Sequence, residues 1–318
     1  MHTVHTRREF VSCASHLALA AVCMPLAVRE RWARVALGTV VADEPFGRLE
    51  QVGEGIWALI STPLGGDYTT TSNGGIIAGR SGVLAIEGFN TPAGATWLAN
   101  KSRELTGRWP THVVLTHYHA DHANGVAGYL GNAAHPVVRT TTTTRELVLT
   151  RNTPTNDARV SALRDAEVIV PIDATRIDLG SRMVRLVPRA GHTASDVSIE
   201  VDDPSLVFCG DLVWNGMFPN YVDATPSALA RSVKALRRPG ATTYVPGHGG
   251  VAHEGDVARY VSMLDEVEAA ARSARAKGIS AAEAALAFAQ PPSLGEWTLF
   301  NKVFYERAFA AWYRELAA

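Results

Sequence analysis

The sequence has 318 residues, of which 47% are hydrophobic and 19% are charged, and its formal net charge is -1. This length is enough for a large core, and it favours one sizeable α/β domain with an appendage over two equal domains. A net charge so close to zero gives no electrostatic reason to expect binding to nucleic acid.

The first 42 residues have the features of a targeting segment. Arg7 and Arg8 precede an apolar stretch of small residues from about 11 to 28, a pattern that resembles a twin-arginine signal. Cleavage is expected after Ala42, with Ala27 as an alternative, and an uncleaved amphipathic helix is the other reading. We therefore expect the twin-arginine export machinery to deliver the chain to the periplasm, with no stable membrane span after cleavage.

The segment after this leader is rich in expected strands. Residues 55–60 form one apolar run, and residues 75–78 and 83–86 form two more, joined by a turn that contains glycine. A polar loop rich in glycine and threonine, residues 61–74, lies between the first two strands. A helix is expected over residues 92–106, because proline stands in its first turn and glycine directly follows it.

The densest group of metal-ligand side chains follows the apolar run 113–115. If that run is a strand, His117 and His119 lie two residues apart and project from the same face. Asp121 and His122 then fall on the turn that follows. Imidazole nitrogen and carboxylate oxygen suit zinc and similar first-row divalent metals. A chance cluster of surface histidines is the alternative reading.

Three further ligand-type residues stand in turns that contain glycine. His192, Asp211 and His248 each follow an apolar, strand-like run. Strand ends that converge on one edge of an α/β sheet are where such folds build their sites. Any one of the three alone would more often be a solvated loop residue. Their order in the sequence after the first cluster indicates that all three belong to the same metal site.

Helices and strands alternate between these residues. Thr143 and Glu146 have the spacing of a capping box, which predicts the start of a helix. A hairpin is expected around residues 178–187, and a helix over 226–237 precedes the strand that carries His248.

After residue 250 the composition shifts to alanine, glutamate and arginine, and three helices are expected, over 256–277, 280–290 and 296–316. The third presents a broad aromatic face with helical spacing, made by Trp297, Phe300, Phe304, Tyr305, Phe309 and Trp312. Packing of this face against the core is the favoured reading, and a homodimer interface is the alternative.

The order His-x-His-x-Asp-His, a separate His, Gly-Asp and Gly-His resembles the metallo-β-lactamase superfamily of binuclear metallohydrolases. The resemblance covers roughly residues 46–252. It implies a four-layer αββα sandwich over 43–252, followed by a C-terminal helical extension over 253–318. An aspartate at position 211 resembles the glyoxalase II, lactonase and alkylsulfatase-like branches, whereas true β-lactamases tend to have cysteine or another residue there.

The same resemblance implies two zinc ions per chain and assigns their ligands. The first ion would be held by His117, His119 and His192. The second would be held by Asp121, His122 and His248. Asp211 would bridge both ions, and Asp121 would also accept a proton from the attacking water.

One position departs from the family pattern. The family usually has aspartate at the end of an early strand, where this chain has Glu87. In the family that carboxylate supports the metal-ligand loop without binding metal, and such partners orient ligands and tune the metal. Glu87 keeps the charge but reaches one methylene further, so it either retains the role with a shifted geometry or marks a divergent site.

Candidate substrate contacts lie in two loops. In the family, the loop between the first two expected strands overhangs the metals, which makes Tyr68 a candidate; a plain solvated loop is the alternative. The segment after Asp211 holds Trp214 and Tyr221. These aromatic side chains suit an apolar substrate group, or else they belong to the core.

Two metal ions can share one hydroxide near neutral pH, and that hydroxide attacks a carbonyl or a related centre. We therefore expect an exported zinc-dependent hydrolase that cleaves an ester, thioester, lactone or lactam-type bond in a small-molecule substrate. An iron-dependent sulfur dioxygenase with the same opening motif is one alternative. A second alternative is a metal-binding accessory protein without catalytic activity, and the departure from the family pattern at Glu87 is the sequence feature that supports it.

Overall fold

A computed structural model describes residues 38–131, 135–154, 156–170 and 173–317. The arginine pair and the apolar stretch of the expected leader lie outside these residues. Strand β1 (Thr39–Glu44) runs across the expected cleavage point after Ala42, so cleavage there would divide a strand. Within the described part, no helix is both long enough and apolar enough to cross a membrane. The elements from Val40 onward form one compact unit.

The first sheet has eight strands in sequential order. Strands β2 to β5 pair antiparallel, and β5 to β8 pair parallel. After β1 its strands are β2 (Gly47–Gly53), β3 (Ile56–Ser61), β4 (Gly74–Ala78), β5 (Val83–Ile86), β6 (His112–Val114), β7 (Val137–Thr140) and β8 (Glu167–Val168).

The second sheet has five strands in the order β13-β12-β11-β10-β9. Its neighbours pair antiparallel except β12 and β13, which run parallel. The strands are β9 (Thr175–Asp178), β10 (Met183–Arg189), β11 (Asp196–Val201), β12 (Leu206–Asn215) and β13 (Thr243–Gly249).

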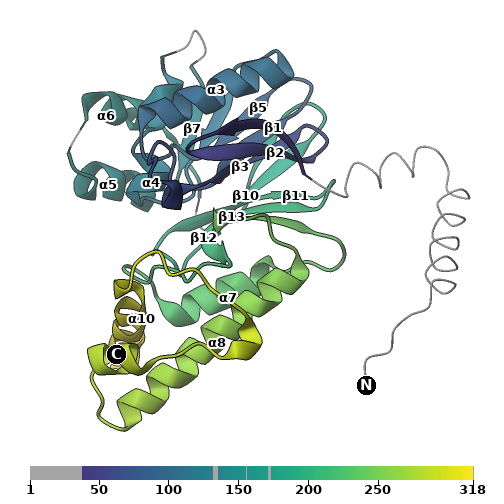
Figure 1. Ribbon diagram of the computed structural model, residues 1–318. Coiled ribbons are helices and arrows are strands. Elements are labelled where there is room, and N and C mark those ends of the chain that lie inside the picture. Colours follow the sequence, from purple (N-terminus) through teal and green to yellow (C-terminus); the bar gives the residue numbers. More distant parts are fainter. Residues whose placement is uncertain (1–37, 132–134, 155, 171–172, 318) are drawn as a thin grey trace, which may run out of the picture. The chain divides into compact units, whose positions relative to one another are not determined.

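Helices cover the outer face of each sheet (Figure 1). On the first sheet these are α3 (Pro92–Thr106), α5 (Thr142–Arg151) and α6 (Asp157–Arg164). On the second they are α7 (Pro226–Leu236), α8 (Glu254–Ala276) and α10 (Val303–Glu315), with α9 (Ala281–Ala287) packed beside α8 and α10.

A separate apolar core lies between the two sheets. Ile77 and Leu84 of the first sheet pack there with Leu186 and Ile199 of the second, and all four side chains are fully buried. Two sheets that share one core and carry helices on their outer faces make four layers. The αββα fold expected from the sequence is therefore confirmed, as is a C-terminal helical region.

The third C-terminal helix was expected to begin at residue 296, and this is wrong. Helix α10 begins at Val303. The residues from 295 to 302 are not helical, and Thr298 forms a β-bridge with Met217. The aromatic face of the helix does pack into the core, since Phe309 and Trp312 are almost fully buried. The homodimer stays a prediction.

The start of α5 also differs from the expected capping box. The cap is Thr141, whose hydroxyl oxygen accepts a hydrogen bond from the Thr144 backbone N–H at 3.0 Å. Several threonines in a row offer alternative caps of the same type, so the local pattern could locate the helix start only to within a turn.

Candidate metal centre

Four of the candidate ligands follow strand β6, which ends at Val114. His117 and His119 therefore lie in the loop beyond the strand and not on the strand itself. Asp121 and His122 lie in the short helix α4 (Ala120–Ala123) that this loop enters. The strand-face argument for the two histidines was wrong in detail, although both side chains still reach one point.

The other three candidate ligands come from the second sheet. His192 lies in the turn between β10 and β11, Asp211 within β12 and His248 within β13. Gly210 has a φ of 53°, and the pairing of β12 with β13 shifts register on both sides of it. Asp211 therefore stands on an irregular stretch of the strand, of the kind that redirects side chains beside active sites.

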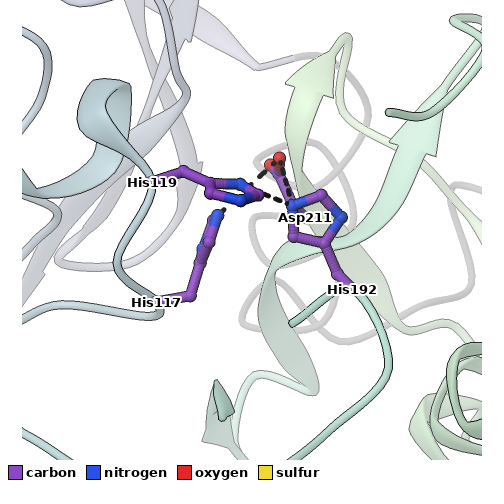
Figure 2. A group of neighbouring side chains, drawn as sticks. All are labelled: His117, His119, His192 and Asp211. Atoms are coloured by element: carbon purple, nitrogen blue, oxygen red, sulfur yellow. Dashed lines mark hydrogen bonds and ion pairs between the residues drawn. The ribbon is translucent and has the colours of Figure 1, made fainter. Parts of the chain in front are cut away.

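His117, His119, His192 and Asp211 form a first group, with ligand atoms within 4.8 Å of one another. Figure 2 shows the three imidazoles converging on the carboxylate from both sides of the site. His192 Nε2 lies 2.9 Å from His119 Nδ1 and 3.2 Å from Asp211 Oδ2. His117 Nε2 lies 3.9 Å from the same carboxylate oxygen.

Asp121, His122 and His248 form a second group with the same closeness of ligand atoms. His248 Nε2 lies 3.3 Å from Asp121 Oδ2, and His122 Nε2 lies 3.7 Å from it. Asp211 Oδ1 lies 3.0 Å from His122 Nε2 and 3.3 Å from His248 Nε2. The two oxygens of Asp211 therefore face different groups, Oδ2 the first and Oδ1 the second.

These donors fit two divalent cations. His117 Nε2 and His192 Nδ1 are buried and make no hydrogen bond among the described residues. His122 Nε2 and Asp211 Oδ1, 3.0 Å apart, are buried there with only each other and neighbouring ligands to contact. Leaving such atoms buried without a partner is costly, so a group that accepts their lone pairs is called for. Imidazole nitrogens and carboxylate oxygens without a cysteine are donors that zinc accepts.

The charge states of the first group favour metal binding. Burial lowers the pKa of His192 to about 3 and holds that of His117 well below its usual value, so both imidazoles are neutral. Burial would raise the pKa of Asp211, but the charges of His248 and His122 bring it well below its usual value. Neutral imidazole and ionised carboxylate are the forms that ligate.

Glu87 supports both groups from outside them. Its Oε1 accepts a hydrogen bond from His122 Nδ1 at 3.0 Å and another from the Thr116 hydroxyl. Thr116 Oγ1 in turn lies 3.0 Å from His117 Nδ1. Glu87 thus holds His122 of the second group directly and His117 of the first group through Thr116, in both cases at the Nδ1 atom of the ring.

Sequence reasoning missed Asp223, the equivalent partner of His119. Asp223 Oδ2 accepts a hydrogen bond from His119 Nε2 at 3.1 Å and another from the Tyr118 hydroxyl. These hydrogen bonds lower the pKa of Asp223. With Nε2 as the donor, His119 presents a bare Nδ1 to the centre. No local pattern around Asp223 signals this role.

Two more residues that sequence reasoning missed hold the ligand turns. Asp196 accepts hydrogen bonds from the backbone N–H groups of His192 and Thr193 and from the Thr193 hydroxyl. Asn73 donates to the carbonyl oxygens of Pro246 and Gly249, on either side of His248. The spacing of Asp196, three residues after Thr193, could have indicated this turn in the sequence. Asn73 could not have been found in this way, because its partners lie more than 170 residues away along the chain.

A cavity of about 250 Å³ opens onto the centre. Asp121, Asp211 and His248 line it, and so does Trp214, whose ring lies 4.0 Å from that of His248. Of the three expected substrate contacts, only Trp214 lies on this cavity. The other two have no support in the geometry, because Tyr68 is 55% exposed outside it and Tyr221 is buried behind it.

The family model of the metallo-beta-lactamase superfamily matches residues 72–248, which hold every candidate ligand. The chain belongs to the metallo-beta-lactamase superfamily. Solved structures with low sequence identity share the fold. A metallo-beta-lactamase from Pontibacter korlensis superposes with a TM-score of 0.57 at 20% identity, over 68% of this chain and 98% of that one. The sec-alkylsulfatase Pisa1 from Pseudomonas sp. superposes with a TM-score of 0.68 at 15% identity, over 94% of this chain and 61% of that one.

Curated superfamily relatives are hydroxyacylglutathione hydrolases. The protein from Cupriavidus taiwanensis is 32% identical over 141 residues, which are 43% of this chain and 49% of the relative. The protein from Hahella chejuensis is 26% identical over 136 residues, which are 42% of this chain and 45% of the relative. The chain thus spans about half the length of the curated relatives it matches.

Proposed function

We propose that this superfamily member is an exported, zinc-dependent hydrolase that cleaves an ester, thioester, lactone or lactam-type bond of a small molecule. The observation that carries the proposal is the orientation of Asp211, which offers one oxygen to each of two ligand groups. Membership of the superfamily and the names of the hydrolase relatives support the reaction class. Export rests on the arginine pair in the leader.

Two bound zinc ions would supply an acidified water and would stabilise the negative charge that develops on the substrate. Asp121 lines the cavity beside them, and as a ligand of the second ion its carboxylate would be ionised. It can therefore accept a proton from the attacking water. Glu87 and Asp223 hold the ligand rings in place, so little rearrangement is required during the reaction.

The test combines metal analysis with a substrate screen. We expect purified protein to contain close to two zinc ions per chain and to hydrolyse at least one member of a panel of p-nitrophenyl esters, lactones, S-lactoylglutathione and β-lactams. Asp121→Asn is the matched variant, because it keeps the shape of the side chain and removes the proton acceptor.

Two results would contradict the proposal. A fully zinc-loaded protein that hydrolyses nothing on the panel would favour an accessory role. A protein that holds iron and consumes dioxygen with a persulfide would favour the sulfur dioxygenase.

A further inference from the structure

A continuous row of aromatic rings runs from the metal centre into the C-terminal extension. The Trp214 ring lies 4.0 Å from His248 and 6.1 Å from Phe304, measured between ring centroids. Phe304 is stacked on Phe300 at 6.4 Å. Trp214, Phe300 and Phe304 all line the cavity above the centre. One wall of the cavity is therefore apolar from its floor to its mouth.

Hydrogen bonds fix the extension in this position. The backbone N–H of Thr298 donates to the Gly216 carbonyl oxygen at 2.8 Å, and the N–H of Phe218 donates to the Thr298 carbonyl oxygen at 2.9 Å. Arg307 of α10 donates to Asn220 Oδ1 at 3.0 Å. The loop after β12 and the segment before α10 are thus held together by three contacts. Phe300 and Phe304 of this wall lie beyond position 248, where the family match ends, whereas Trp214 lies within the match.

The cavity offers a substrate neither a lysine nor an arginine side chain among the described residues. Its titratable members are all candidate metal ligands: His119, Asp121, Asp211 and His248. The nearby Arg307 lies over the Phe304 ring at 5.7 Å and donates to Asn220. An anionic group held against this wall would lose its hydration without gaining a counter-charge, whereas an apolar group gains by burial there.

We infer that the C-terminal extension makes this centre selective for uncharged carboxylic esters or lactones that carry an alkyl or aryl group, over substrates with a distal anionic group such as glutathione thioesters. The inference rests on the proposed hydrolase function. In the reaction the acyl carbon–oxygen bond breaks, water adds to the acyl carbon, and the leaving alcohol takes up a proton. The apolar group lies along Trp214 and Phe300, away from the ligand carboxylates.

The test compares p-nitrophenyl acetate, p-nitrophenyl hexanoate and S-lactoylglutathione on the zinc-loaded protein. We expect kcat/KM to be higher for hexanoate than for acetate and lowest for S-lactoylglutathione. Phe300 is 41% exposed, so Phe300→Ala should leave folding intact. That change should raise KM for hexanoate about fivefold to tenfold and KM for acetate by less, because acetate lacks the alkyl chain, with kcat nearly constant. Leu286→Ala is the matched control, because Leu286 is 89% exposed on α9 and lies outside the cavity.

A binding measurement tests the contribution of the apolar wall to affinity independently of the hydrolysis step. The uncharged ketone 2-octanone has the apolar chain but no bond to hydrolyse, and calorimetry should show that Phe300→Ala weakens its binding while Leu286→Ala does not. Preference for S-lactoylglutathione, or an unchanged KM and ketone affinity in Phe300→Ala, would overturn the inference and leave the hydrolase standing. Absence of hydrolysis with all substrates would overturn both.

Discussion

At the scale of single residues, the centre depends on how closely two backbones approach. Asp211 can face both ligand groups because Gly247 lies against it: a Cβ at position 247 would stand 1.9 Å from Asp211 Oδ1. No side chain fits at that distance, so glycine is required there for steric reasons. The turn that carries His248 is thus shaped around the carboxylate that would bridge the metals.

Asp211→Ala should reduce the zinc content from close to two ions per chain to close to one. Each group keeps three ligands but loses the shared carboxylate, whose negative charge offsets the repulsion between the two ions, so the more weakly held ion is released first. Turnover should fall by about 100-fold or more. Elemental analysis beside kcat measures both effects. Gly247→Ala is the companion variant, which keeps the carboxylate and displaces it. One zinc ion in the parent and in Asp211→Ala would instead show a mononuclear site.

Glu87→Gln should keep both metals and lower kcat about 10-fold to 100-fold. The amide can accept from His122 Nδ1 with its oxygen, but its NH₂ group cannot accept from the Thr116 backbone N–H, which now donates to Glu87 Oε2 at 3.2 Å. Glu87→Asp keeps two acceptor oxygens and should retain most of the activity. Metal content and kcat are measured together, and loss of a full metal equivalent in Glu87→Gln would make Glu87 a ligand.

At the scale of elements, the sequence predicted those site residues that short-range patterns mark, and it missed those that only long-range contacts bring to the site. His192, Asp211 and His248 could be found because each follows an apolar run and stands beside glycine. Asp223 could not, since its partner His119 is far away along the chain and only the folded loops bring the two together. The aromatic spacing around Phe300 looked helical, but the backbone of Thr298 hydrogen-bonds to Gly216 and Phe218, and the segment is not helical. Long-range hydrogen bonds overrode local periodicity there.

Strand β11 holds a buried carboxylate whose effect on stability should depend on pH. Glu200 accepts hydrogen bonds from Arg189, Arg185 and Arg238. Burial alone would raise its pKa, but the hydrogen bonds from Arg189, Ser198 and Arg238 bring it below the usual value. Because the folded-state pKa is depressed, the stabilisation is present above the unfolded pKa of about 4.3 and is lost as pH falls through the folded value.

Glu200→Gln should therefore lower the free energy of unfolding by about 2 kcal/mol at pH 7. The difference from the parent protein should shrink as the pH falls below about 4. Urea denaturation at several pH values measures it. Glu104→Gln serves as the control, because Glu104 is exposed on α3 and its pair with Lys101 should matter little. A difference that stays constant with pH would show that Glu200 acts through packing alone.

At the scale of the whole molecule, the proposed route of export makes its own prediction. Lysine keeps the charge of arginine but not its planar guanidinium. Replacing Arg7 and Arg8 by lysine should therefore hold the protein in the cytoplasm, as measured by cell fractionation. The control replaces Arg29 and Arg31 by lysine, which changes the composition equally and leaves the pair intact. Equal periplasmic recovery of both variants would contradict twin-arginine export.

The ligands of each group come from both halves of the fold: the loop after β6 or helix α4 on one side, and the β10–β11 turn, β12 or β13 on the other. A bound ion would thus join chain segments that are distant in sequence, as a disulfide does elsewhere; Cys209 is a buried free thiol in the described part. Anything that binds only the folded form raises its stability by mass action. Chelation should therefore lower the melting temperature, and added zinc should restore it. The concentration of available zinc would then determine the resistance of the protein to proteolysis as well as its activity.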